Sequence, residues 1–414
     1  MKLQKYSIGT GDRFGCQGKA QLKAVIKAKE DNLDIAIVWN KSYREHMIIG
    51  TKPADVLNEA QASVKELDWN GDYYVDADHV SFSNIDMFID YCNFFTLDVA
   101  DFIGQKATDQ EITGFIEKFK RYNGEIRLSN LNECLLVTDE ILHAIATKYL
   151  LAIKEAGRIY RKIVKKKGEN NFITEISMDE TSKPQTPIEL FFILAAISEE
   201  KIPIQTIAPR FYGKFIKGVD FVGNVDNFRE EFEMILTIIQ HAIQEFSLPD
   251  NLKLSVHSGS DKFSIYGVIN KALKKYDAGL HLKTAGTSWL EELIGLAMAG
   301  GEGLEIAKEI YVKAYGRYEE LCTPYATVID IEKQRLPLPE KVKSWDKEDF
   351  TNALRHNLSC EDYNPNFRQL LHVGYKIAAE MGTRYTEALK TYKDIIARNV
   401  TQNIYERHIK GLFL

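Results

Sequence analysis

Short runs of β-forming residues recur along this chain, and each run ends in polar residues that precede a segment with the spacing of a helix. Because strands that alternate with helices pair into parallel sheets, this alternation predicts an α/β fold. There are eight runs, and eight is the number of strands that closes a (β/α)8 barrel of about 250 residues. The runs lie at residues 6–8, 34–39, 73–77, 94–99, 171–178, 202–207, 252–256 and 280–282.

We therefore predict a TIM-type barrel as the catalytic domain, over residues 1–330. The long interval 98–171, between the fourth and fifth runs, has a helical pattern and is interpreted as an insertion in the barrel. Residues 331–414 contain no convincing further strand, and their helical patterns predict a C-terminal helical extension that packs on the barrel.

The main alternative is an open doubly wound sheet, which usually carries a glycine-rich phosphate turn after its first strand. Gly9, Gly11 and Gly15 have the spacing GxGxxxG instead of GxGxxG, and this difference argues against a dinucleotide site. The sequence also has no GxSxG, GxxxxGK[ST] or HExxH motif. Serine hydrolases, P-loop nucleotidases and zincins are therefore disfavoured.

The composition limits the partners and the compartment that we expect. The 414 residues carry a net charge of −6, so no surplus of basic residues exists for nucleic-acid phosphates. The longest apolar runs, such as 188–197, are half as long as the roughly 20 residues of a membrane span, and the N-terminus lacks an apolar signal segment. Five cysteines without CxxC spacing fit a reducing cytoplasm. We expect a cytoplasmic protein that binds a small sugar or sugar acid and binds neither nucleic acid nor membranes. Its expected protein partner is a second copy of itself, in a homo-oligomer.

Histidines mark the predicted active site. Barrel enzymes place their active sites at the carboxyl ends of the strands, and His79, His257 and His281 fall at or beside such ends. Imidazole binds Zn²⁺, Mn²⁺, Co²⁺, Ni²⁺ and Fe²⁺, and three protein ligands with open positions are the usual catalytic arrangement. These three histidines therefore predict a site for a divalent metal cation. The alternative is that His79 and His281 are buried residues with satisfied hydrogen bonds.

Carboxylates accompany the histidines at the predicted strand ends. Glu175 and Asp179 share the face of the fifth run that would line the barrel lumen, and Asp76 and Asp78 share a face of the third run. Asp78, Glu175 and Asp179 are the candidate catalytic groups, because a carboxylate near a metal can be tuned as a proton acceptor or donor. Two alternatives stay open: such a carboxylate could instead be a metal ligand, or Asp76 could orient a ligand histidine.

Cationic residues at the strand ends are candidates for binding a substrate carboxylate or phosphate. Lys283 begins a turn of small residues before a predicted helix, and backbone N–H groups at a helix N-terminus bind anions. The alternative for this turn is N-capping by Thr287 or Ser288, which does not exclude anion binding. The candidate substrate-binding residues are Arg13, Arg210, Lys262 and Lys283.

Several short segments together carry a family resemblance. They are SIGTGDRFG at 7–15, DADHV at 76–80, MDE at 178–180 with PQTP at 184–187, PRF at 209–211, HSGSDK at 257–262 and KTAGTS at 283–288. In order and spacing they resemble the tagaturonate/fructuronate epimerases, which are hexuronate C4-epimerases, and some members of this family act on tagatose and fructose. The resemblance extends from the first strand to the 365–376 segment.

The resemblance implies a divalent-metal-dependent barrel enzyme that inverts one hydroxyl-bearing carbon of a ketohexose or keto-hexuronate. It implies that Asp78 is a proton acceptor beside the metal ligand His79. Glu175 or Asp179 would be the opposing acid. His257 and His281 would complete the metal site.

The chemistry leaves two routes and two rival functions open. C4 of a 2-ketose is β to the carbonyl, so its proton is not acidic. Retro-aldol cleavage of C3–C4 is favoured, because a metal and one acid–base pair suffice and no nicotinamide motif is visible. Migration of the carbonyl to C3 is the other route. The rival functions are another metal-dependent sugar enzyme, such as a class II-type aldolase or an isomerase, and a non-catalytic carbohydrate-binding barrel.

Overall fold

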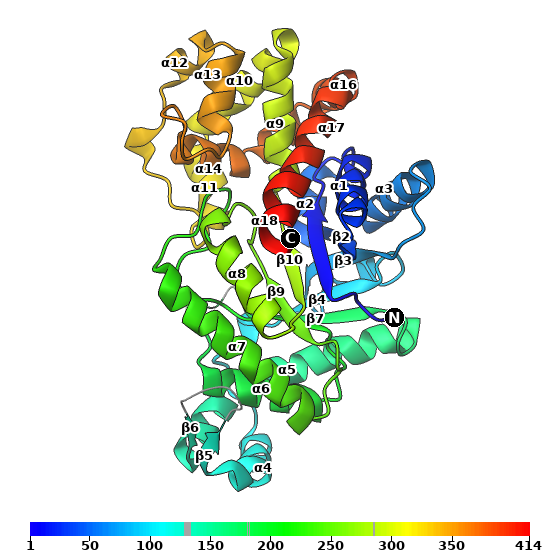
Figure 1. Cartoon of the computed structure of the whole chain (residues 1–414), viewed down its shortest axis with the longest axis vertical. Coiled ribbons are helices and arrows are strands. Elements are labelled where there is room, and N and C mark those ends of the chain that lie inside the picture. Colours follow the sequence, from blue (N-terminus) through cyan, green and yellow to red (C-terminus); the bar gives the residue numbers. More distant parts are fainter. Residues whose placement is uncertain (128–133, 180, 182, 285) are drawn as a thin grey trace.

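Eight parallel strands close into a barrel in the computed structural model of the chain, and helices surround it (Figure 1). The structure describes residues 1–127, 134–179, 181, 183–284 and 286–414. Each predicted run overlaps one strand, so the (β/α)8 barrel is confirmed and the open doubly wound sheet is wrong. Around the barrel the order is β1 (Tyr6–Gly11), β10 (Leu280–Lys283), β9 (Lys253–Val256), β8 (Thr206–Ala208), β7 (Ile173–Ser177), β4 (Phe94–Asp98), β3 (Tyr73–Val80) and β2 (Ile35–Ser42).

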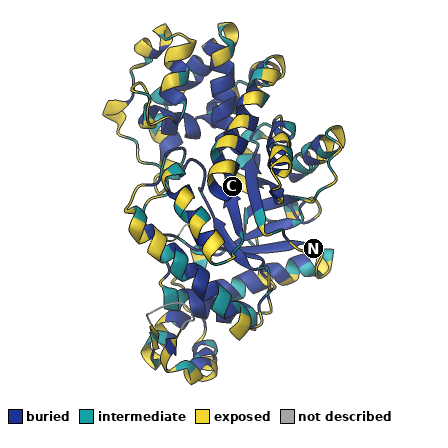
Figure 2. Cartoon of the chain, viewed as in Figure 1, coloured by how far each residue is buried: buried dark blue, intermediate teal, exposed yellow. Residues whose placement is uncertain are grey.

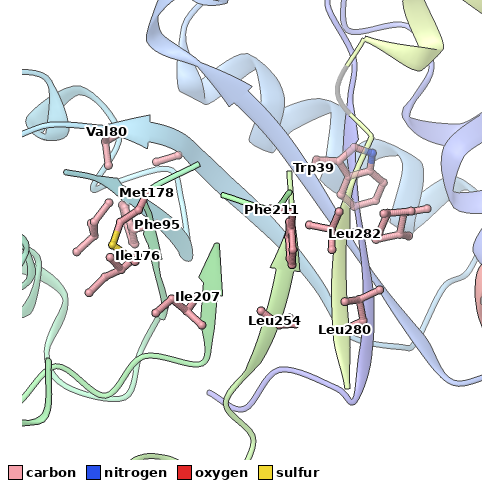
Figure 3. Close-up of a cluster of buried hydrophobic side chains, with 14 of the residues drawn as sticks. Trp39, Val80, Phe95, Ile176, Met178, Ile207, Phe211, Leu254, Leu280 and Leu282 are labelled. Atoms are coloured by element: carbon pink, nitrogen blue, oxygen red, sulfur yellow. The ribbon is translucent and has the colours of Figure 1, made fainter. Parts of the chain in front are cut away.

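Alternation along the strands gives the barrel an apolar outside and a polar upper lumen. On β10, Leu280 and Leu282 belong to the core between sheet and helices, whereas His281 and Lys283 lie on the opposite, lumen side. Figure 3 shows the buried apolar side chains that project from successive strands into this core. A second, smaller apolar cluster fills the lumen towards the amino ends of the strands. It comprises Leu3, Ala36, Val38, Tyr74, Phe94 and Ile173.

Local sequence signals set where the barrel helices begin. At α6 (Pro187–Glu199), the Thr186 hydroxyl accepts a hydrogen bond from the Glu189 N–H, the Glu189 carboxylate accepts one from the Thr186 N–H, and Pro187 opens the helix. The long α5 (Asp139–Lys167) and α7 (Val225–Glu245) pack on its two sides. The other helices of this layer are α1 (Gly18–Glu30), α3 (Pro53–Glu66), α8 (Phe263–Lys275) and α9 (Thr287–Ala299).

The insertion between β4 and β7 contains a small sheet that sequence analysis did not predict. After α4 (Asp109–Phe119), strands β5 (Gly124–Arg127) and β6 (Cys134–Val137) pair antiparallel at one end of the molecule (Figure 1). Each strand has four residues, and only Ile126 and Val137 of them are buried. So short and so exposed a pair leaves no clear alternating pattern in the sequence.

Most of the C-terminal helices gather at the opposite end of the molecule (Figure 1). They pack on one another and on α9, and their buried inner and exposed outer faces are visible in Figure 2. The helices are α10 (Gly301–Gly316), α11 (Tyr318–Cys322), α12 (Pro339–Ser344), α13 (Lys347–Leu354), α14 (Pro365–Val373), α15 (Tyr375–Glu380), α16 (Thr383–Thr391), α17 (Lys393–Gln402) and α18 (Lys410–Phe413).

The last part of the chain returns to the barrel wall. Helix α17 and the π-helical segment Asn403–Ile409 pack against α1, and α18 packs against α8. The Phe413 ring lies 5.0 Å from the Tyr6 ring of β1. The C-terminus therefore contributes to the outer layer between α8 and α1, and the helical extension is anchored on the barrel at both of its ends. Among the described residues, no helix is long and apolar enough to cross a membrane.

Candidate active site

Three residues from different strand ends meet at the mouth of the barrel. They are His79 near the end of β3, Asp179 after β7 and His257 after β9, and their ligand atoms all lie within 4.8 Å of one another. Asp179 Oδ1 lies 3.2 Å from His257 Nδ1 and 3.5 Å from His79 Nε2. Two ring nitrogens thus face one carboxylate oxygen from two sides.

A carboxylate stands behind each of the two imidazole rings. His79 Nδ1 lies 2.9 Å from Asp78 Oδ1, and His257 Nε2 lies 2.8 Å from Glu175 Oε1. An ionised carboxylate only accepts hydrogen bonds, so these outer ring nitrogens are the ones that donate. The inner nitrogens face Asp179, and the carboxylates around the two rings raise the pKa of both His79 and His257 against the effect of burial. Histidine ligands of metals commonly have this carboxylate partner, which sets their tautomer and orientation.

The backbone at His79 departs from regular strand geometry. The register between β3 and β4 shifts between Ala77 and Val80, and His79 has a φ of 55°. A non-glycine residue in this left-handed region is strained, and such strain persists only where surrounding contacts hold it. The irregularity lets Asp78 and His79 both face the site, although neighbouring residues of a regular strand point to opposite sides.

Lys283 connects the carboxylates beneath the two histidines. Its Nζ lies 2.9 Å from Asp76 Oδ2, 2.8 Å from Asp78 Oδ1 and 2.9 Å from Glu175 Oε1. The same ammonium donates a hydrogen bond to the Thr96 hydroxyl. All of these groups are buried, so the charges are screened little by water.

This arrangement moves the pKa values of the site. Burial alone would raise the pKa of Glu175, but Lys283 and His257 outweigh it and hold that pKa well below its ordinary value. Burial would also raise the pKa of Asp78, but Lys283 and His79 outweigh this effect and lower that pKa. Desolvation raises the pKa of Asp76 to about 6, although Lys283 opposes the shift.

His281 does not join the other two histidines. It pairs in register with Ser255, two residues before His257, so its ring lies one layer deeper in the lumen. There Nδ1 lies 2.9 Å from Ser7 Oγ and the ring packs against Phe94. Burial lowers the pKa of His281 to about 3, which keeps the ring neutral. The structure therefore does not bring His281 together with His79 and His257, and Asp179, predicted as a catalytic group, lies in the third position instead.

Glu175 also lies deeper than expected for an acid that reaches a substrate. Its side chain is fully buried, and Oε1 is engaged by both His257 and Lys283. The expected role of Glu175 as the opposing acid does not fit this place. A carboxylate in this place orients the imidazole of His257, a role that the sequence analysis considered for Asp76 alone.

Two of the four candidate substrate cations are already bound within the protein. Lys262 Nζ donates to the carbonyls of Ile216, Val219 and Ser260, at 2.8, 2.7 and 2.9 Å. Lys283 is surrounded by the three carboxylates described above. Both ammonium groups are thus engaged by groups of the protein, and the expected role of the two residues in substrate binding stays a prediction.

The other two cations, Arg210 and Arg13, line separate clefts at the mouth. Arg210 lines a cleft of about 330 Å³ with Asp179 and His257, and its Nη1 donates to the Thr181 carbonyl. Arg13 lines a second cleft, of about 310 Å³, in which Asp78 and His79 also lie. Arg13 pairs with Glu45 and stacks on Tyr375, with its guanidinium carbon 3.9 Å from the ring centroid.

A segment of the C-terminal region separates the two clefts. Thr327 and Val328 line both of them, and the Val328 carbonyl accepts a hydrogen bond from the Lys217 N–H. Sequence analysis missed this segment because it has neither strand nor helix periodicity. It also missed Thr96, which the alternation Phe94, Thr96, Asp98 could have placed on the lumen face.

Comparison with known proteins identifies the family. The family model described as UxaE, tagaturonate epimerase, matches residues 1–412. The chain belongs to the tagaturonate epimerase family. It is thus an epimerase, as the family resemblance in the sequence predicts.

Relatives of this epimerase family agree with the match. A tagaturonate/fructuronate epimerase of Thermotoga maritima is 30% identical over 418 residues, which cover 97% of this chain and 80% of the relative. Crystal structures of a fructuronate-tagaturonate epimerase from Cohnella laeviribosi share its fold. The form with one glycerol has a TM-score of 0.81 at 24% identity, and the native form 0.79 at 23%; both cover 100% of this chain and 82% of the other.

In this epimerase, replacing Lys283 tests whether the buried charges depend on it. Lys283→Met leaves three buried carboxylates without their cation, so we expect the free energy of unfolding of the metal-free protein to fall by about 3–5 kcal/mol. The matched control is Lys118→Met, which breaks the exposed pair with Glu199 and should cost less than about 1 kcal/mol. Urea denaturation measures both values. If Lys283→Met and Lys118→Met both lowered the free energy of unfolding by the same small amount, the three carboxylates would not all be ionised at once.

Proposed function

We propose that the chain is a divalent-metal-dependent epimerase that interconverts tagaturonate and fructuronate by inverting C4. The observation that carries the proposal is the group of His79, Asp179 and His257 at the barrel mouth. The names of the Thermotoga maritima and Cohnella laeviribosi relatives support the choice of substrates. No feature of the described residues favours an aldolase, another isomerase or a non-catalytic carbohydrate-binding barrel over an epimerase.

The three residues fit a divalent cation. Two imidazole nitrogens and a carboxylate oxygen converge within 4.8 Å of one another, and all three can donate an electron pair to a cation once the rings are neutral. This donor set suits Zn²⁺, Mn²⁺, Co²⁺, Ni²⁺ or Fe²⁺, and three protein ligands leave positions open for a substrate. Asp78 and Glu175 would hold the two rings in place. When bound, such a cation polarises the oxygen atoms of a keto sugar and stabilises the negative charge that develops on them.

Asp78 is the group that we propose to move the proton. It lines the cleft beside His79, and Lys283 and His79 keep its carboxylate ionised against the effect of burial. In the retro-aldol route, Asp78 takes the proton of the C4 hydroxyl as C3–C4 breaks, and the electron pair passes to C3 next to the C2 carbonyl. The aldehyde half then turns over. C3–C4 forms again on the other face of C4, and the proton returns to the new C4 oxygen.

Arg210 is the group that we propose to bind the carboxylate of the uronate. Of the described cations in the first cleft, Lys214 pairs with Asp330 at 3.0 Å, whereas no carboxylate among the residues that the structure describes pairs with Arg210. The guanidinium therefore keeps N–H groups available within the cleft that holds Asp179 and His257. A planar guanidinium also matches a carboxylate in shape and charge.

Loss of His257 should remove the metal and the activity together. We expect His257→Ala, purified and reloaded with Zn²⁺ or Mn²⁺, to retain no stoichiometric metal by elemental analysis and to have no measurable epimerase activity. The barrel should stay folded, since its stability rests on packed layers. The control is His143→Ala, which changes an exposed histidine of α5 and should bind metal as the parent does. Full metal content in His257→Ala would contradict the assigned site.

The solvent isotope distinguishes the two routes. Metal-loaded protein incubated with tagaturonate in D₂O should form fructuronate without deuterium at C4, because retro-aldol cleavage never breaks that C–H bond. Carbonyl migration would instead introduce deuterium at C4 from the solvent. Mass spectrometry and NMR of the product identify both the product and the label.

The charge of the substrate tests the role of Arg210. A hydrogen bond to a charged group contributes roughly 1.5–3 kcal/mol, which corresponds to about 10–150-fold in affinity. We expect Arg210→Met to lower kcat/KM for tagaturonate by this factor and for neutral tagatose by less than about threefold, since tagatose has no carboxylate to lose a partner. Equal losses on the two substrates would mean that Arg210 contacts a part that they share.

A further inference from the structure

The loop that follows His257 adopts a strained conformation. Residues 257–262 connect β9 to α8, and two of them, Ser258 and Asp261, have left-handed φ values of 48° and 63°. Gly259 between them has no room for a side chain, since a Cβ would lie 2.4 Å from Leu282 Cδ1. Non-glycine residues keep such angles only when contacts from elsewhere hold them.

Those contacts come from the C-terminal helices. The Asp261 carboxylate is fully buried, and its Oδ1 accepts hydrogen bonds from Arg368 Nη2 of α14 at 3.0 Å and from His356 Nδ1 at 3.2 Å. The Asp261 N–H donates to His408 Nε2 of the π-helical segment, also at 3.2 Å. We name these four residues, Asp261, Arg368, His356 and His408, the Asp261 network.

The network also joins the loop to backbone carbonyls of the helical extension and of the barrel. Arg368 Nη1 donates to the Leu354 carbonyl at 2.9 Å, and its Nε donates to the Gly218 carbonyl. On the other side of the loop, Lys262 binds the carbonyls of Ile216 and Val219. The three nitrogens of the Arg368 guanidinium therefore donate hydrogen bonds to three different groups, and the single ammonium of a lysine could not reproduce this planar arrangement.

None of the network residues touches the reacting groups. His257 and Ser258 of the loop line the first cleft. Among the described residues that line either cleft, there is no member of the Asp261 network. Asp261 lies four residues beyond His257, and the Gly259 N–H between them donates to the Lys283 carbonyl of β10 at 3.0 Å. The loop thus connects His257, the proposed metal ligand, to the buried ion pair between Asp261 and Arg368.

We infer that Asp261 and Arg368 are positioning residues, which fix the loop after β9 so that His257 faces His79 and Asp179. The inference rests on the proposed metal site. It gives the C-terminal helices an indirect part in the active site, because they supply the buried cation that holds Asp261. Side chains that orient metal ligands from behind typically change metal affinity about 10–100-fold when they are replaced.

Two variants and one control test this inference. Asp261→Asn keeps the shape of the side chain and removes its charge, and the double variant Asp261→Asn/Arg368→Met removes the whole ion pair, so that no unpaired charge stays buried. The control is Leu389→Ala on α16, which makes a cavity in the same helical region and lies outside the network. Urea denaturation establishes that each protein is folded and by how much it is destabilised.

Two measurements are then made on each protein, namely Zn²⁺ affinity by competition with a chelator and hydrogen exchange of the Gly259 amide in the metal-free protein. We expect both network variants to bind Zn²⁺ about 10–100-fold more weakly and to exchange the Gly259 amide at least about 10-fold faster. Leu389→Ala should leave both values within about twofold of the parent at a similar loss of stability.

Either value unchanged in both network variants overturns the inference, and so does an equal change in Leu389→Ala. If the parent itself binds no metal, the proposed metal site fails. The exchange of the Gly259 amide then decides by itself whether the network holds the loop.

Discussion

A single buried ammonium group compensates the negative charge inside this barrel. Lys283 reaches from β10 across the lumen to Asp76 and Asp78 of β3 and to Glu175 of β7. Carboxylates buried without a cation take up protons instead of remaining ionised. Because Lys283 keeps both carboxylates ionised, Asp78 can accept a hydrogen bond from His79, and Glu175 can accept one from His257. These two hydrogen bonds set the orientation of the imidazole rings.

The same dependence explains how the site is layered. The ammonium and its carboxylates lie lowest, the two imidazole rings rest on them, and Asp179 faces both rings from the third strand end. Each layer satisfies the hydrogen bonds of the one above it, so the ring nitrogens that remain are aimed at one point. Preorganisation of this kind places charge before a substrate arrives and avoids reorganisation during the reaction.

The barrel by itself does not complete the site. The 324–330 segment separates the two clefts, and the Asp261 network holds the loop after β9 from the side of the C-terminal helices. The 324–330 segment and the three partners of Asp261 come from chain beyond the last strand. The two charged groups of the network are buried completely, and a buried pair of this kind favours one arrangement because breaking it leaves an unpaired charge.

Much of the fold could be predicted because it depends on local patterns. The alternation of Leu280 and Leu282 with His281 and Lys283 already indicates a strand with one apolar and one polar face. The convergence of His79, His257 and Asp179 also follows from the sequence, since carboxyl ends of parallel strands meet at one rim. The hairpin β5–β6 was not predictable in this way, because its strands are short and exposed.

The sequence by itself determined the kinds of side chain that face the lumen and the strand ends at which they lie. Only the tertiary structure decided their depth and their partners. Two residues along a strand change the depth of a side chain by about 6.6 Å, so the stagger of the strands separates His281 from the position at which His79, Asp179 and His257 meet. The partners of Lys283 and Lys262 were decided by closure of the barrel and by folding of the intervening chain, because electrostatic pairing acts between residues far apart in sequence and follows no periodic pattern.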